Sequence, residues 1–105
     1  MINVGKVARE LRESLRLTQR EMAHELGITN VQLSLIENSK SFPSRALIDR
    51  FRDKFEVDLY ILAWCRDESA ENKIPPPLRR PADELAKAWE ERFKTVVKRY
   101  QRPEP

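Results

Sequence analysis

Two helix-start signals, separated by one glycine, constrain this chain more than any other feature of its sequence. Thr18 is followed three residues later by Glu21, and Thr29 is followed by Gln32 at the same spacing. In such a capping box the hydroxyl accepts from an unpaired first-turn amide, and the longer side chain reaches back to the amide of the cap. Gly27 lies between the two signals and can end the first helix in a left-handed conformation.

Apolar residues follow both signals at helical spacing. The predicted inward positions are Met22, Ala23 and Leu26 in the first helix, and Leu33 and Ile36 in a second helix that runs to about Asn38. Two short helices joined by so tight a turn cannot lie antiparallel, so they must cross steeply. That arrangement is a helix-turn-helix.

Three further helices are predicted around this pair. The first carries an apolar stripe of Val4, Val7, Ala8, Leu11 and Leu15. Ser44 and Asp58 suit the N-caps of the other two. The chain has only two glycines among its 105 residues, which disfavours a turn-rich β fold. We expect an all-α fold, with a five-helix domain over residues 1–66.

The composition changes after residue 66. A polar stretch and the run Pro75-Pro76-Pro77 predict a stiff linker over residues 67–80. Pro81 then suits the first turn of an amphipathic helix over residues 81–102. We expect its apolar face to pair with the same helix of a second subunit, through Leu85, Trp89, Phe93, Val96 and Tyr100. The alternative is docking within the chain, onto Leu59, Ile61 and Trp64.

Charge and composition narrow the function classes. The net charge of +3 is compatible with a polyanionic partner. Residues 1–66 hold 11 Lys and Arg against 9 Asp and Glu, so any nucleic acid must be bound by a shaped surface rather than by a polybasic tail. No run of about 18 apolar residues could span a membrane, and the N-terminus lacks the apolar core of a signal peptide. We therefore expect a cytoplasmic protein.

No pattern of catalytic chemistry is present in the sequence. His24 is the only histidine and has no cysteine or carboxylate at metal-ligand spacing. Cys65 is the only cysteine and has no histidine nearby, so a packed thiol is the simpler interpretation. Without a phosphate-cradling glycine loop or a catalytic triad, we expect no enzyme, no metal and no cofactor.

Two stretches carry a resemblance to a known family: LTQREMAHELGIT at residues 17–29 and LSLIEN at residues 33–38. They resemble the lambda repressor/Cro-like helix-turn-helix family, whose pattern reads roughly L-T-Q-x-E-L-A-x-x-L-G-[IV]-[ST], then [IL]-S-x-[IWL]-E. The resemblance extends from about Val4 to Leu62. It is specific, because the inward residues, the glycine turn and both caps coincide.

The resemblance implies a DNA-binding surface. The family's base-facing positions fall on Thr29, Asn30, Val31, Ser34 and Leu35, with Gln32 beside them as a further base contact, at the start of a recognition helix that enters the major groove. Gln19 matches the family residue at a phosphate-binding helix N-terminus, and we expect further contacts to the phosphate backbone from Asn38, Lys40 and Arg45. Arg12 and Glu37 match a family ion pair that ties the first helix to the recognition helix.

The function implied is that of a small bacterial or phage transcriptional regulator, a repressor that binds double-stranded DNA at a palindromic operator as a homodimer. Val31 and Leu35 depart from the family, because relatives often carry polar residues there. They could read thymine methyl groups, or they could face a protein partner, as in an antitoxin-like or other regulatory interaction protein. Ser39 and Glu56 replace glycines that are common at helix ends in the family.

Overall fold

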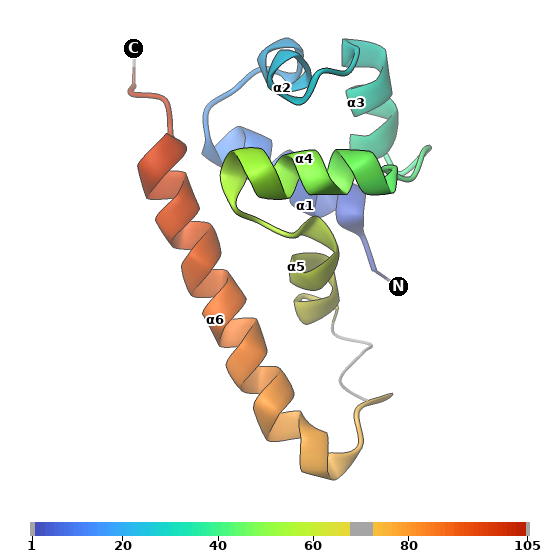
Figure 1. Ribbon diagram of the computed structural model, residues 1–105, viewed down its shortest axis with the longest axis vertical. Coiled ribbons are helices and arrows are strands. Elements are labelled where there is room, and N and C mark those ends of the chain that lie inside the picture. The colour runs from blue at the N-terminus through green and yellow to red at the C-terminus, as the bar shows by residue number, and fades with distance from the viewer. Residues whose placement is uncertain (1, 68–72, 105) are drawn as a thin grey trace.

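Six α-helices and no strands make up the part of the chain that the computed structural model describes, residues 2–67 and 73–104 (Figure 1). They are α1 (Val4–Ser14), α2 (Gln19–Leu26), α3 (Asn30–Glu37), α4 (Arg45–Phe55), α5 (Leu59–Cys65) and α6 (Pro76–Tyr100). The all-α class and the additional C-terminal helix are confirmed. None of the described helices is both long and apolar enough to cross a membrane.

Both predicted capping boxes are present. The Thr18 hydroxyl accepts from the Glu21 amide at 3.1 Å, and the Glu21 carboxylate accepts from the Thr18 amide at 3.0 Å. The Thr29 hydroxyl accepts from the Gln32 amide at 3.0 Å, and the Gln32 carbonyl accepts from the Thr29 amide at 2.9 Å. Gly27, at φ 67°, ends α2 in the left-handed conformation. The caps therefore fix where α2 and α3 begin.

The core of the five-helix domain lies between α1, α3, α4 and α5. Its fully buried side chains include Leu11, Leu15, Leu33, Phe51, Leu59 and Leu62. Gly5 allows a close approach of α1 to α3, because a Cβ atom at this position would lie 2.1 Å from the carbonyl oxygen of Ile36. This packing holds the C-terminal end of α3 against α1.

Three residues other than glycine have a left-handed backbone: Arg16 (φ 61°), Ser39 (φ 59°) and Glu56 (φ 58°). Ser39 and Glu56 thus keep the conformation of the glycines they replace, at about 1 kcal/mol or more each. Glu56 gains a tertiary contact, since its carboxylate accepts from the Arg99 guanidinium at 2.5 Å.

Helix α6 begins at Pro76, five residues before the predicted start at Pro81. Proline is tolerated throughout a first helical turn, because the amides there have no partner within the helix. Pro76 and Pro77 are the first two residues of α6 and satisfy that condition, with Pro75 as the N-cap, whereas Pro81 lies inside the helix. The proline run therefore starts the helix and does not belong to the predicted linker. Of the linker predicted over 67–80, residues 68–72 lie outside the described residues.

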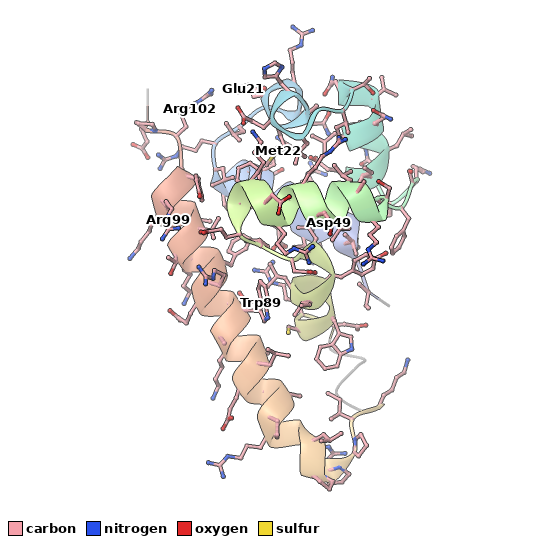
Figure 2. All side chains as sticks on the ribbon, in the orientation of Figure 1. Glu21, Met22, Asp49, Trp89, Arg99 and Arg102 are labelled. Carbon is pink, nitrogen blue, oxygen red and sulfur yellow. The ribbon has the colours of Figure 1, made fainter. Side chains whose placement is uncertain are left out.

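The apolar stripe of α6 packs against its own chain. Val96 is fully buried, Trp89 and Phe93 pack against the same core, and the Tyr100 ring stands edge-on to Phe55 with centroids 5.9 Å apart. Figure 2 shows Trp89 between α6 and α5. This arrangement corrects the expectation that Trp89, Phe93 and Val96 face a second subunit, because they pack within the chain. Tyr100 also contacts its own chain, although its exposed fraction is 40%. Intramolecular docking, the alternative interpretation, describes this half of the helix.

Arg66 fastens α6 to the domain. Its guanidinium donates to both carboxylate oxygens of Glu90, at 2.6 and 3.1 Å, and also contacts Glu10 of α1. It also lies over the Phe93 ring, 4.7 Å from the centroid. One arginine after α5 therefore joins α1 to α6.

The N-terminal half of α6 extends past α5 (Figure 1). Leu78 and Leu85 on this half have exposed fractions of 56% and 44%. Of the residues predicted for the dimer face, only Leu85 is both exposed and located on this N-terminal half. We refer to residues 76–88 as the α6 overhang.

Candidate nucleic-acid interface

Helix α3 lies beside α2 at the end of the molecule's long axis opposite the start of α6 (Figure 1). Leu33 and Ile36 are buried and hold one side of α3 against the core. The other side is open, and it carries most of the predicted base-facing residues: Thr29, Asn30, Val31, Gln32 and Leu35 are exposed, and Ser34 is half-buried. The structure thus gathers this predicted set on the outer side of one short helix.

The polar groups of this surface differ in how free they are. The Gln32 carbonyl is occupied by the capping box, although its amide N–H groups remain. The Asn38 amide donates to the backbone carbonyl of Ser34 at 2.9 Å and to its hydroxyl at 3.3 Å. Asn30, the first residue of α3, has an exposed amide for which the described residues offer no partner. Asn30 is therefore the freest polar group on the surface.

Glu37 fixes the position of α3 from behind. Its side chain is 1% exposed and accepts from Arg12 Nε at 2.8 Å, from Arg12 Nη2 at 3.0 Å and from Gln19 Nε2 at 3.1 Å. Arg12 also donates to the Leu17 carbonyl at 3.0 Å. The predicted partners Arg12 and Glu37 are thus brought together, and the pair binds α1, the start of α2 and the end of α3 to one another.

Gln19 has a structural contact that its predicted phosphate role did not include. Its side-chain amide donates to Glu37, so part of its donor capacity is already used. The backbone amides of Gln19 and Arg20, the first two of α2, donate to no acceptor among the described residues. Such unpaired first-turn amides favour an anion.

Exposed cationic side chains without a carboxylate partner among the described residues occur close to α2 and α3, and they include Arg20, Lys40 and Arg45. Lys40 and Arg45 were predicted as phosphate contacts. Arg20 was not predicted, although its place beside Gln19 at the start of α2 was a usable signal. Arg50, by contrast, is engaged, because its guanidinium donates to the Leu26 carbonyl at 2.9 Å.

An exposed aromatic pair borders this surface and was also not predicted. Phe42, in the loop between α3 and α4, lies with its ring centroid 5.6 Å from that of Tyr60 on α5. Phe42 and Leu35 both line a groove of about 230 Å³. Neither aromatic residue belongs to a helical stripe that would have identified it in the sequence.

A helix pair with capped starts, a glycine turn and an outward-facing second helix defines a helix-turn-helix protein. The helix-turn-helix family matches residues 9–62, just over half of the chain and most of the five-helix domain. The chain belongs to this family, of the lambda repressor and Cro type. Its members are DNA-binding transcriptional regulators, and this protein is one of them. The chain matched no curated protein and no solved structure.

Proposed function

We propose that the protein is a sequence-specific repressor that binds a palindromic operator as a homodimer. The observation that carries the proposal is the exposed start of α3 on a helix held rigidly from behind by Glu37, Arg12 and Gln19. A recognition helix must keep its orientation while its N-terminal residues meet base edges in the major groove. A charge-assisted network stabilises that orientation.

The residues of the interface divide into two roles. Base edges are read by Thr29, Asn30, Val31, Gln32, Ser34 and Leu35. Phosphates are bound by Gln19, Asn38, Lys40 and Arg45, together with Arg20. The free amide of Asn30 has the chemistry for a bidentate pair with adenine, and the exposed cations add sequence-independent attraction to the backbone.

The homodimer forms through the α6 overhang in this proposal. Leu78, Ala82 and Leu85 are spaced four and three residues apart, which is the spacing of a coiled-coil seam. Leu78 and Leu85 are exposed, and a row of exposed leucines on a helix favours association. Both recognition helices must face the same side of a duplex. The two overhangs therefore pair with each other in parallel, so that both DNA-binding domains lie at the same end of the dimer.

The DNA-binding part of the proposal is tested by selecting duplexes from a random pool at a fixed salt concentration. We expect a palindrome to be enriched. Asn30→Ala should lose about 1–3 kcal/mol of binding free energy on the selected duplex only, whereas Lys40→Ala should weaken binding to selected and random duplexes alike. An equal loss on both duplexes for Asn30→Ala would contradict base reading by that residue.

The repressor and dimer parts need separate measurements. A reporter gene with the selected site across its promoter should be transcribed less when the protein is present. Sedimentation should show a dimer that Leu85→Glu dissociates. Lys87→Gln is the matched control, since it changes the charge by the same amount and lies about half a turn away from the seam on the same overhang. A monomer for the unmodified chain would contradict the dimer.

A further inference from the structure

We infer that Val31 and Leu35 recognise the C5-methyl groups of two thymines in each half-site, an inference that rests on the proposed function. Among the four bases, thymine alone presents an apolar group in the major groove. Val31 is 68% exposed and Leu35 is 43% exposed. They stand four residues apart on α3, so their side chains share one face of the helix.

The neighbouring polar groups on α3 leave this face short of hydrogen-bonding capacity. The Gln32 carbonyl is held by the Thr29 amide, and the Ser34 hydroxyl accepts from Asn38. The only charged residue of α3, Glu37, is buried in the pair with Arg12. The exposed face therefore offers the Asn30 amide, the Gln32 N–H groups and two aliphatic side chains, and no charged group.

The combination selects A·T pairs. The Asn30 amide can pair with the N6 and N7 atoms of adenine, and the adjacent Val31 has the chemistry for a thymine methyl group. One turn further along the helix, Leu35 supplies a second aliphatic contact. We expect each half-site to hold an adenine and two thymines at the positions that meet the start of α3.

The contact is well preorganised. Valine in a helix has one strongly preferred χ1 rotamer, so Val31 loses little side-chain entropy on binding. The helix itself is held at its start by the Thr29 cap and at its end by Glu37. Methyl contacts made from so fixed a surface are sensitive to small shifts in position, which makes them useful for specificity.

The experiment replaces thymines of the selected duplex, one at a time, by 2′-deoxyuridine. This substitution removes the C5-methyl group and leaves the pairing edge unchanged. Burial of one methyl group corresponds to about a fourfold change in affinity. We expect a loss of about that size at two positions in each half-site, and no change at thymines outside them.

Protein variants assign each position to its residue. Replacing thymine by uracil at one of the two positions should no longer weaken binding by the Val31→Ala variant. For the Leu35→Ala variant, the same should hold at the other position. Ile61→Ala is the matched control, an exposed aliphatic residue of α5 that should leave both positions sensitive. Circular dichroism melting of each variant checks that the fold is retained.

The outcomes separate this inference from the proposed function. An enriched palindrome that tolerates uracil at every position would overturn methyl recognition and leave the proposed function standing. In that case the apolar face is available to a protein partner instead. A pool in which no sequence is enriched would overturn the proposed function, and this inference with it.

Discussion

At the scale of single residues, Glu37 connects the core to the DNA-binding surface. It is the last residue of α3 and accepts three hydrogen bonds, two from Arg12 and one from Gln19. Within the described residues, no buried side-chain nitrogen or oxygen lacks a partner. A satisfied buried network of this kind holds one geometry, because any displacement leaves a polar group unpaired.

Removal of Glu37 should therefore destabilise the whole domain. Glu37→Ala leaves the half-buried Arg12 guanidinium without its partner, and we expect a loss of about 3 kcal/mol in the free energy of unfolding. The measurement is urea denaturation followed by circular dichroism. Glu91→Ala is the control, because its ion pair with Lys94 is exposed and should contribute less than about 1 kcal/mol. Equal losses for the two variants would contradict a structural role for the buried pair.

At the scale of elements, α6 has two halves with different surroundings. Its C-terminal half is packed, with Val96 in the core and Arg66 bound to Glu90. The chain after the helix continues the contact, since the Gln101 side chain donates to the Ser14 carbonyl at 2.9 Å and the Arg102 amide donates to the Leu15 carbonyl at 3.1 Å. Arg102 also reaches Glu21 of the α2 capping box. The C-terminal segment is thus attached to the start of the helix-turn-helix.

Val96 tests whether this half of α6 docks within one chain. Val96→Ala deletes two methylene equivalents from the core and should lower the free energy of unfolding by about 2 kcal/mol. Because the contact is intramolecular, the loss should not change over an about tenfold range of protein concentration. Val97→Ala, at the half-buried neighbouring residue, should lose clearly less. A loss for Val96→Ala that grows on dilution would indicate packing between subunits.

Glu90 should make the docking of α6 sensitive to acid. The hydrogen bonds and the charge of Arg66 lower the pKa of Glu90 below its ordinary value of 4.5. The folded state then binds fewer protons than the unfolded state, so this stabilisation is complete above about pH 4.5 and is lost as the pH falls through the lowered pKa. The pair is partly exposed, so we expect a contribution of no more than about 1 kcal/mol.

The measurement for Glu90 is the melting temperature as a function of pH below 4.5. The Glu90→Gln variant should be less stable than the unmodified chain at neutral pH and should converge with it as the pH falls. Glu84→Gln is the control, because among the described residues Glu84 pairs only with the exposed Arg80 of its own helix. A difference that persists unchanged in acid would contradict the role assigned to the Glu90 carboxylate.

At the scale of the whole molecule, the position of the charges matters more than their sum. The net charge is only +3, and the long axis of 44 Å separates the helix-turn-helix from the start of α6. Arg20 at the start of α2 and Arg80 on the α6 overhang carry the same charge at opposite ends. If DNA were attracted by net charge alone, the two arginines would contribute equally to binding. If Arg20 contacts a phosphate, it should contribute more than Arg80.

The salt dependence of DNA binding distinguishes the two cases. We expect Arg20→Ala to reduce the slope of log affinity against log salt by about 0.9 for each phosphate that the protein ceases to neutralise, on a random-sequence duplex. Arg80→Ala should leave the slope unchanged. The measurement is a fluorescence anisotropy titration at several salt concentrations, and equal reductions for both variants would indicate a diffuse electrostatic effect instead of contacts at α2.

Local patterns in the sequence determined the elements of the DNA-binding domain. The Thr18 and Thr29 capping boxes and the Gly27 turn depend on neighbours within four residues. They can therefore be recognised in the sequence without knowledge of the fold. The pairing of Arg12 with Glu37 is not local, and it was available only through the family resemblance. The start of α6 was misplaced because a first-turn proline is tolerated at several positions, and no local signal chose between Pro76 and Pro81.

Tertiary structure alone decided what each amphipathic face contacts. The apolar stripe of α6 predicts that one face of this helix is buried. The stripe does not identify the part of the chain, or the second subunit, against which that face packs. The burial of Val96, the contact of Arg66 with Glu90 and the donation from Gln19 to Glu37 all join residues more than 15 positions apart. Such pairs form only when the helices are packed, because chain proximity does not bring them together. The sequence by itself thus determined the helices and the outward residues of α3, and packing decided which faces remained free.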